Sequence, residues 1–292
     1  MKKYFSKKLY VSFLLPALLI YSVFVIAPAF VLIPVSFQNN NSIVNLGWVG
    51  LDNFREVFAD KGFWISHLNL LKLFAVNIAV FPIGWILAFK LNRTEGWVNK
   101  VFRFAALFPS ILAITTVAKL AQGVLNSNWG LVNSLLNAIG LEEWTHSWLS
   151  EKATAMWCVA LTSAWWGLGS GVIIKYAAMK SISRDYVDAA MLDGCTPSQA
   201  DWKIYFPLLR NILQYEIITG VVGTLCTYAI IAIMGGKTTA SLMALPITII
   251  VDTSMTRLKF GLGCAMALVF FVECIVVSIL VSKLTDWEIY EY

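Results

Sequence analysis

Three sets of small and polar side chains recur at helical spacing inside long apolar segments. The sets are Thr115, Lys119 and Gln122; Ser163, Trp166, Gly167 and Ser170; and Gly220, Thr224 and Thr227, with Tyr228 beside them. Residues three, four or seven apart lie on one face of a helix. Hydroxyl and amide groups beside an aromatic ring suit a sugar, whose apolar face stacks while its edge forms hydrogen bonds. Small residues also let helices pack closely, so both interpretations stay open.

Lys119 is the unusual member of these sets, because it falls in the middle of the apolar segment 102–125. A charge inside a membrane span is costly and usually faces the interior of the helix bundle or a water-filled path. Glu216 and Glu273 are candidate buried partners for its ammonium group. Alternatively, Lys119 faces an anionic substrate such as an acidic glycan.

No catalytic or metal-binding pattern accompanies the polar sets. The chain has no H-E-x-x-H and no G-x-S-x-G, its five cysteines have no C-x-x-C spacing, and His67 is far from His146. Gly236-Lys237-Thr238 lacks the first glycine of a phosphate-binding loop, since Ile231 stands five positions before Gly236. We therefore expect a chain that is not an enzyme and holds no cofactor or metal of its own.

The composition is that of an integral membrane protein. Of 292 residues, 59% are hydrophobic and 13% are charged, and the mean hydropathy is +0.72. An average soluble domain is about 45–50% apolar and about 25% charged. The net charge of +5 is modest, and there is no Lys/Arg stripe with interleaved aromatic residues, so we expect no nucleic-acid partner. The predicted environment is the lipid bilayer.

Six segments are long and apolar enough to cross a membrane as helices. They are residues 10–36, 66–90, 102–125, 153–179, 209–234 and 261–283. The first contains Ala27-Pro28-Ala29, which looks like a signal-peptide cleavage site, but its apolar run is too long and continues past that site. The prediction is an all-α membrane protein, residues 1–292 forming a single transmembrane domain with six spans and an uncleaved first helix.

Basic residues indicate how these spans are oriented, since they are more frequent in cytoplasmic segments. With the N-terminus inside, the cytoplasmic segments hold Lys2, Lys3, Lys7, Lys8, Lys90, Arg93, Lys100, Arg103, Lys175, Lys180, Arg184, Lys203, Arg210 and Lys283. The external segments hold only Arg55, Lys61, Lys152, Lys237, Arg257 and Lys259. We therefore expect both termini, and the loop between the fourth and fifth spans, in the cytoplasm.

That loop, residues 183–208, is predicted to form two short helices joined by a tight bend. Ser183 suits the N-cap position, and Asp185 follows in the first turn, where the helix dipole favours an anion. Gly194 permits a tight turn, and Pro197 suits the first position of a second helix. Such a unit is a rigid lever rather than a flexible linker. The simpler alternative is an amphipathic helix lying on the membrane surface.

The same loop resembles the EAA loop of bacterial ABC importer permeases, whose pattern is roughly E-A-A-x-x-D-G-A followed by a more distant F-x-x-I-x-x-P. The matching residues are Asp188, Ala189, Ala190, Asp193, Gly194 and Pro207. Two positions depart from the pattern: the leading Glu is Asp188, and the Ala after the glycine is Cys195. The resemblance implies a coupling helix between spans four and five that docks on a separate cytoplasmic ATPase.

Other blocks, in order, resemble the sugar-importing, maltose-type branch of these permeases. They are Gly50-Leu51-Asp52-Asn53-Phe54, Gly130-Leu131-Val132-Asn133, Trp165-Trp166-Gly167 and Phe260-Gly261-Leu262-Gly263. The resemblance implies the permease subunit of a carbohydrate uptake system in the bacterial cytoplasmic (inner) membrane, forming half of the translocation path. Its implied partners are a homologous second permease, two ATPase subunits that bind ATP and Mg²⁺, and a solute-binding protein. The external loops 37–64, 127–152 and 235–260 would meet that binding protein.

Two other functions remain open at this point. One is an ABC importer permease for a solute other than sugar. The other is an ion-coupled secondary transporter, which would show inverted repeats and broken helices. The sequence offers no convincing repeat pair, and a secondary transporter would leave the EAA-like loop unexplained.

Overall fold

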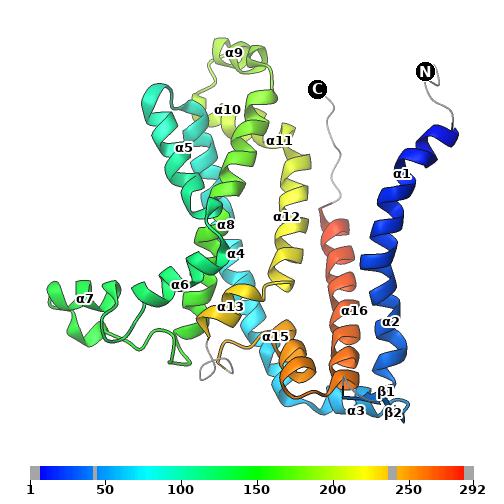
Figure 1. Ribbon diagram of the computed structural model, residues 1–292. Coiled ribbons are helices and arrows are strands. Elements are labelled where there is room, and N and C mark those ends of the chain that lie inside the picture. The colour runs from blue at the N-terminus through cyan, green and yellow to red at the C-terminus, as the bar shows by residue number, and fades with distance from the viewer. Residues whose placement is uncertain (1–6, 42–44, 236–241, 286–292) are drawn as a thin grey trace. The chain divides into compact units, whose positions relative to one another are not determined.

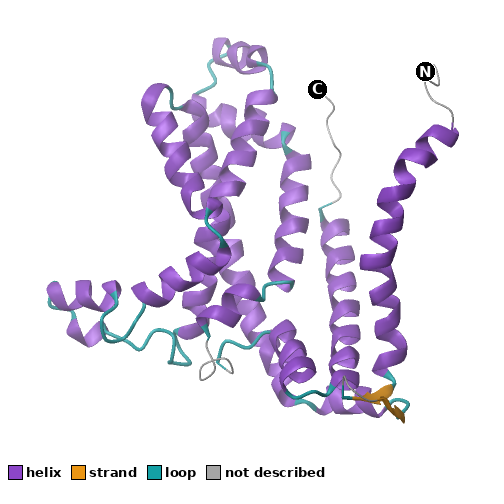
Figure 2. Ribbon diagram, viewed as in Figure 1, coloured by secondary structure: helices purple, strands orange, loops and turns teal. Residues whose placement is uncertain are grey.

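The computed structural model describes residues 7–41, 45–235 and 242–285, and these are mostly helical (Figures 1 and 2). The predictions for Lys2, Lys3, both chain ends and Gly236-Lys237-Thr238 fall outside the described residues. Long apolar segments form helices because a bilayer offers no hydrogen-bond partner to the backbone, which must pair within itself. Contacts within the chain divide it into two compact units, residues 1–63 with 249–273 and residues 64–248 with 274–292.

The first unit begins with a long apolar helix, followed by a small sheet and a short helix. Its elements are α1 (Lys7–Tyr21), a π-helical turn (Ser22–Ile26), α2 (Ala27–Ser36), β1 (Gln38–Asn40), β2 (Asn45–Trp48) and α3 (Asp52–Ala59). The two strands pair antiparallel, with Gln38 opposite Trp48. Residues 249–273 of this unit hold the end of α15 (Pro246–Val251), a π-helical turn (Asp252–Thr256) and the first part of α16 (Phe260–Leu284).

Side chains of the first unit fix the chain where it turns after α2. The Asn53 amide donates to the carbonyls of Ser36 and Gln38 at 2.8 and 2.9 Å. Lys259 Nζ lies 2.7 Å from Glu56 Oε1. At Gly261, a Cβ would overlap the carbonyl of Gln38, so only glycine allows this close approach. The Gly-Leu-Asp-Asn-Phe and Phe-Gly blocks noted in the sequence thus meet here.

Within the described residues, the second unit consists of helices and connecting loops without a strand. Its long helices are α4 (Lys61–Arg93), α5 (Gly96–Ile111), α8 (Ala155–Ser181) and α12 (Arg210–Leu225). Its short helices are α6 (Ile114–Val124), α7 (Leu131–Ala138), a 3₁₀ turn (Glu142–Trp144), α9 (Arg184–Leu192), α10 (Pro197–Ala200), a π-helical turn (Asp201–Tyr205), α11 (Phe206–Leu208) and α13 (Ala229–Met234).

The core of this unit lies where α4, α8 and the start of α12 meet. Its buried side chains include Trp85, Phe89, Val172, Met179, Leu209 and Leu213. On another side, α8 packs closely on α5 at Gly169, where a Cβ would overlap the backbone carbonyl of Ala106. Small residues permit such close helix packing, which is the main source of attraction between helices in lipid.

The described residues contain five helices long and apolar enough to span a membrane, and a bent pair that could form a sixth span. The pair is α5 with α6, which meet at 96°. The segment predicted as the span 102–125 is therefore not one continuous helix but is broken between Ile111 and Ile114. Pro109 in the last turn of α5 cannot donate a backbone hydrogen bond, and Leu112 and Ala113 adopt extended backbone conformations. The indole of Trp166 donates to the freed Leu112 carbonyl at 3.0 Å.

Candidate functional site

A cavity of about 600 Å³ lies within the second unit, between α4, α8 and the segment α12–α13. It is lined by six of the residues predicted for the substrate path: Ser163, Trp166, Gly167, Thr224, Thr227 and Tyr228. Ser170 and Gly220 from the same stripes line it as well. The stripes that helical spacing selected on the fourth and fifth spans thus line one cavity.

A chain of hydrogen bonds holds the polar wall of this cavity on α12. The Asn77 amide on α4 donates to Thr224 Oγ1 at 2.9 Å, and the Thr224 hydroxyl donates to the Gly220 carbonyl at 2.7 Å. The Thr227 hydroxyl donates to the Gly223 carbonyl at 2.9 Å. The buried Ser163 hydroxyl has no hydrogen-bond partner in the described part of the chain. Asn77 is a polar residue of the second span that the sequence analysis missed.

Two opposite charges also line the cavity and are bonded to each other. Lys175 Nζ on α8 lies 2.5 Å from Glu216 Oε1 on α12, and their side chains are only 5% and 11% exposed. The ammonium group also faces the rings of Phe81 and Trp85, at 5.7 and 5.4 Å from their centroids. A buried charge needs such compensation, because removing an ion from water costs several kcal/mol.

Glycines make room for this ion pair. A Cβ on Gly84 or on Gly171 would each lie 3.4 Å from Lys175 Nζ. Lys175, which was predicted to belong to a cytoplasmic segment, lies inside α8. Glu216 stands four positions before Gly220, on the face of that stripe, and this spacing was the missed signal. Lys175 stands four positions after Gly171, which also lines the cavity but was not part of a predicted stripe.

Lys119 and Gln122 lie outside this cavity, which corrects their predicted place. They line a separate pocket at the end of α6. The Gln122 amide donates to the carbonyls of Ile233 and Met234 at 2.6 and 3.2 Å, so it ties α6 to the end of α13. Glu216 is not the partner of Lys119, because it binds Lys175. Lys119 instead donates to Gln122 Oε1 at 3.0 Å, and the described residues show no ion pair that includes it.

The predicted helix–bend–helix loop is present and follows α8 directly. Ser183 Oγ accepts the Asp185 amide hydrogen bond at 3.3 Å and so caps α9. After α9, Gly194 has a φ of +83°, a conformation that glycine adopts without steric cost. The amides of Gly194 and Cys195 donate back to Met191 and Ala190 at 3.0 and 2.9 Å. These two bonds form a Schellman cap, which fixes the direction in which the chain leaves α9.

The second half of the loop is anchored to the rest of the unit. Thr196 and Gln199 form a capping box at the start of α10. Buried Asp201 makes an ion pair with Arg93 at the end of α4. The rings of Trp202 and Phe206 contact each other and those of Phe89 and Trp85, with centroids 5.1–5.2 Å apart in each pair. Pro207 lies at the start of α11, within this anchored stretch.

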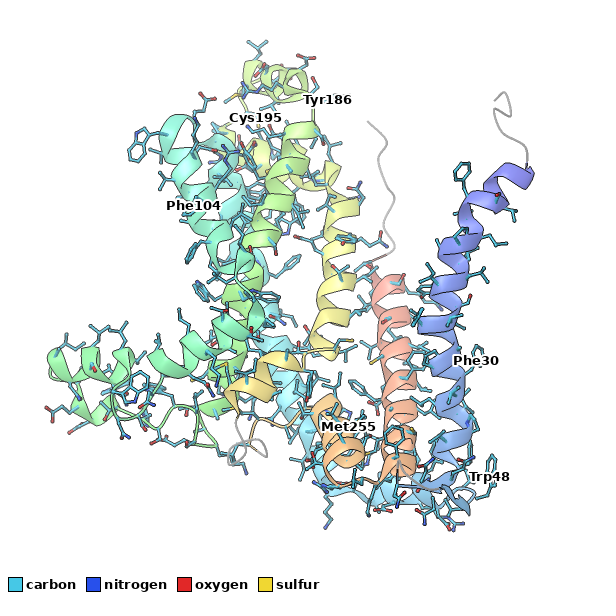
Figure 3. The ribbon with its side chains drawn as sticks, viewed as in Figure 1. Phe30, Trp48, Phe104, Tyr186, Cys195 and Met255 are labelled. Carbon is cyan, nitrogen blue, oxygen red and sulfur yellow. The ribbon has the colours of Figure 1, made fainter. Side chains whose placement is uncertain are left out.

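In contrast, α9 has no buried residue. Asp188, Ala189 and Asp193 are exposed, and Leu192 is 90% exposed. Figure 3 labels Tyr186, which is 53% exposed, and Cys195 at this end of the unit. Apart from the exposed ion pair of Arg184 with Glu95, α9 is a capped helix whose side chains stay exposed or only partly buried.

A family model describing the binding-protein-dependent transport system inner membrane component matches residues 80–286. The chain belongs to this family. The match covers the loop 183–208 and the cavity lining except Leu73 and Asn77 on α4. The chain is accordingly the membrane component of a transport system, and the membrane-spanning helices expected from composition agree with that family.

Curated relatives of this family member align over nearly all of its length. The probable ABC transporter permease protein YurN of Bacillus subtilis (strain 168) is 28% identical over 276 residues, covering 93% of this chain and 94% of YurN. The trehalose/maltose transport system permease protein MalF of Thermococcus litoralis is 25% identical, covering 96% of this chain and 95% of MalF.

A solved structure shares the fold of this permease. It is the crystal structure of a bacterial ABC transporter involved in the import of the acidic polysaccharide alginate. The TM-score is 0.84 at 21% sequence identity, covering 95% of this chain and 94% of the matched chain. At this level of identity the likeness establishes the fold of the permease, a helical transmembrane subunit.

Proposed function

We propose that this chain is the permease subunit of an ATP-driven, binding-protein-dependent importer of carbohydrate, and that it forms half of the translocation path. Relatives named for trehalose/maltose, lactose, multiple sugars and diacetylchitobiose support a carbohydrate substrate. The other half of the path would come from a second, homologous permease. A solute-binding protein would deliver the sugar.

The observation that carries the proposal is the exposed, rigidly held helix α9. Its Schellman cap and the anchored segment after it prevent the loop from yielding when α9 is pushed. A force applied to α9 would therefore reach α8 through the N-terminal end of α9, which follows α8 directly. It would reach α4 through the ion pair between Asp201 and Arg93. Both helices line the cavity. This is the arrangement that a coupling helix needs when the chemical energy is released on another polypeptide.

The residues proposed for the contact with the ATPase are Asp188, Ala189, Ala190, Asp193, Gly194 and Pro207. The small Ala189 and Ala190 allow close approach, and Asp188 and Asp193 offer carboxylates without partners in the described chain. Gly194 sets the bend, and Pro207 belongs to the anchored stretch rather than to the exposed surface. ATP and Mg²⁺ would bind to the ATPase subunits alone.

The cavity supplies groups suited to a sugar. Tyr228 and Tyr215 are 37% and 58% exposed, so their rings are available for stacking. Threonine hydroxyls and the Asn77 amide lie on the same walls. Substrate sites usually combine apolar or aromatic walls with a few placed polar groups. Trp166 is the least available of the predicted groups, since its indole N–H is already engaged by Leu112.

The orientation of the chain in the membrane follows from the same proposal. With α9 in the cytoplasm, the loop that precedes α8 lies on the external side, because α8 separates the two. The external loops 37–64, 127–152 and 235–260 would then face the binding protein, and both chain ends would be cytoplasmic. The membrane would be the bacterial cytoplasmic (inner) membrane.

The test is purification of the tagged chain from its native membranes in three forms: wild type, Leu192→Asp and Lys100→Asp. Leu192 lies on the exposed surface of α9, and Lys100 is an exposed residue of α5 that serves as the matched control. We expect an ATPase and a second permease to accompany the wild type and Lys100→Asp, and the ATPase to be lost from Leu192→Asp. A wild-type chain that purifies without any ATPase and moves sugar without ATP would contradict the proposal.

A further inference from the structure

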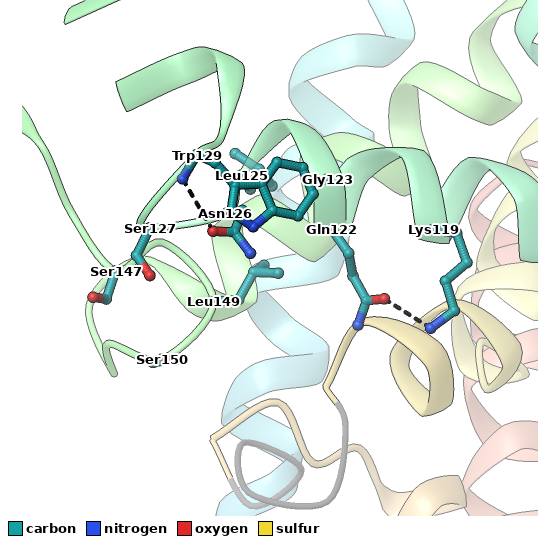
Figure 4. A pocket seen from close by; sticks show the side chains of 10 residues that line it. All are labelled: Lys119, Gln122, Gly123, Leu125, Asn126, Ser127, Trp129, Ser147, Leu149 and Ser150. Carbon is teal, nitrogen blue, oxygen red and sulfur yellow. Dashed lines mark hydrogen bonds between the residues drawn. The ribbon is translucent and has the colours of Figure 1, made fainter. Parts of the chain in front are cut away.

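A second pocket, of about 480 Å³, lies at the end of α6 and is not part of the cavity described above (Figure 4). Its walls come from α6 and from the loops on either side of α7, all within the same compact unit. The residues that matter for its chemistry are Lys119, Gln122, Asn126, Trp129, Ser147 and Ser150. α8 begins just after this pocket and ends just before α9, so the pocket and α9 lie at opposite ends of that helix.

The walls of this pocket are held in place by backbone contacts. Asn126 Oδ1 accepts hydrogen bonds from the amides of Asn128 and Trp129 at 2.9 and 3.3 Å. Asn133 binds three segments at once: its amide donates to the carbonyls of Ser127 and His146, and its Oδ1 accepts from the Trp148 indole at 2.7 Å. A pocket formed before its ligand arrives loses less entropy on binding.

The pocket carries an uncompensated positive charge. Lys119 is exposed and makes one hydrogen bond, to Gln122 Oε1 at 3.0 Å, which leaves two of its three N–H groups free of partners in the described chain. Glu151, the acidic residue that follows the pocket wall, is already bound by His146 Nδ1 at 3.0 Å and by the Ser147 amide at 2.7 Å. An anion entering the pocket would therefore meet a cation that no carboxylate of the described residues neutralises.

The opposite end of the pocket offers an aromatic plate. The Trp129 ring lies against Gly123, where a Cβ would come within 3.6 and 3.7 Å of the indole, and the side chain is 68% exposed. Asn126 Oδ1 accepts from backbone amides, and the described chain shows no hydrogen bond from its NH₂ group. Lys119 lies on α6, whereas Asn126 and Trp129 follow the end of that helix, and Figure 4 shows them on opposite sides of the pocket. The pocket thus has a charge on one side and a ring and a donor on the other.

We propose that this pocket is an entry subsite for a carboxylated saccharide, in which Lys119 binds the carboxylate and Trp129 stacks on a sugar ring. The proposal rests on the proposed function, since a subsite here serves a carbohydrate that passes from the external side to the cavity. Gln122 is a positioning residue, because its Oε1 orients the Lys119 ammonium while its amide is bound to α13. The importer would then favour uronate-containing glycans over neutral glycans of the same length.

The experiment measures binding of a hexuronate trisaccharide to the purified full-length chain together with the subunits that accompany it. The reference ligand is the same trisaccharide with its carboxyl groups reduced to alcohols. The variants are Lys119→Met, Lys119→Arg and Trp129→Ala, and Lys152→Met is the matched control, since Lys152 is exposed nearby but does not line the pocket.

We expect the uronate form to bind the wild type about tenfold more tightly than the reduced form, as a charge-assisted hydrogen bond allows. Lys119→Met should remove that difference, Lys119→Arg should keep most of it, and Lys152→Met should leave it unchanged. Trp129→Ala should weaken both ligands. Equal affinity of wild type and Lys119→Met for the uronate form, or no binding of either ligand, would overturn the proposal.

Two further readouts separate this proposal from others. If Lys119→Met weakens the docking of the solute-binding protein, or the retention of anionic lipid, while uronate binding is unchanged, the pocket holds a partner other than a saccharide and the proposal is wrong. ATP hydrolysis is measured in the same preparations. Normal ATP-driven uptake with no dependence of glycan affinity on Lys119 would overturn the subsite and leave the importer function standing. If uronate binding depends on Lys119 as predicted but no ATPase accompanies the chain, the importer function would be overturned and the subsite would stand.

Discussion

Lys175 on α8 and Glu216 on α12 lie 2.5 Å apart across a cavity wall, and both side chains are almost fully buried. The pair joins two helices that belong to different spans, so each charge depends on the other helix staying in place. Two cation–π contacts from α4 add to the compensation of Lys175. The pair therefore links the three helices that surround the cavity.

The ion pair predicts how the stabilities of single and double variants at Lys175 and Glu216 should differ. Lys175→Met leaves the Glu216 carboxylate buried without a partner, and this should lower the free energy of unfolding by about 3–5 kcal/mol. Glu216→Leu should do the same to the ammonium group. The double variant should be more stable than either single variant, because neither charge remains. Thermal unfolding of the purified protein in detergent measures this, and strictly additive losses would show that the two side chains do not interact.

Two glycines on α8 provide a matched pair for helix packing. A Cβ at Gly169 would overlap the Ala106 carbonyl, whereas a Cβ at Gly167 would meet nothing within 4 Å. Gly169→Ala should force α8 away from α5 and strongly reduce the yield of folded protein. Gly167→Ala should be tolerated and gain up to about 1 kcal/mol from helix propensity. The measurement compares the expression yield and the thermal stability of Gly169→Ala with those of Gly167→Ala. Equal yields and equal stabilities would contradict the close approach at Gly169.

Gly194 should control the rigidity of the loop rather than the stability of the whole protein. Its φ of +83° is unfavourable for alanine, so Gly194→Ala should cost about 1–2 kcal/mol, mostly as local opening of α9. Gly194→Asn is the control, since asparagine tolerates this conformation better. Hydrogen exchange measured by mass spectrometry should speed up over 184–195 in Gly194→Ala and change little in Gly194→Asn. Unchanged exchange in both variants would show that the cap does not stabilise α9.

Trp166 should act on the break between α5 and α6 rather than on sugar affinity. Trp166→Phe keeps an aromatic ring but loses the hydrogen bond to the Leu112 carbonyl, which should cost about 1–3 kcal/mol. Trp165→Phe is the control, because Trp165 is 43% exposed on the neighbouring position. A drop in sugar affinity with unchanged stability in Trp166→Phe would instead support the stacking role.

The parts of the structure that local sequence determines were predicted well. The cap of α9, the bend at Gly194 and the start of α10 depend on residues within a few positions of one another, so Ser183, Gly194 and Pro197 were enough to predict them. The shared faces of Ser163 with Gly167, and of Thr224 with Thr227, follow from the helical period alone.

The parts that depend on distant contacts were not predicted. The break after Ile111 involves two extended residues and a hydrogen bond from Trp166, 54 positions away, and an average of hydropathy over the segment does not register it. Glu216 was one of two candidate partners for Lys119, and only the packing of α8 on α12 shows that it pairs with Lys175 instead. The bend then places Lys119 in a pocket of its own.

The central claim is that ATP hydrolysis on another subunit drives sugar through this permease by way of α9. The most direct measurement is uptake of radiolabelled sugar into proteoliposomes that contain the purified complex and its solute-binding protein, with ATP on the side of the ATPase. The account predicts ATP-dependent uptake by the wild type and by Lys100→Asp, and loss of both uptake and ATPase binding in Leu192→Asp. Uptake by Leu192→Asp equal to that of the wild type, or uptake that does not require ATP, would contradict it.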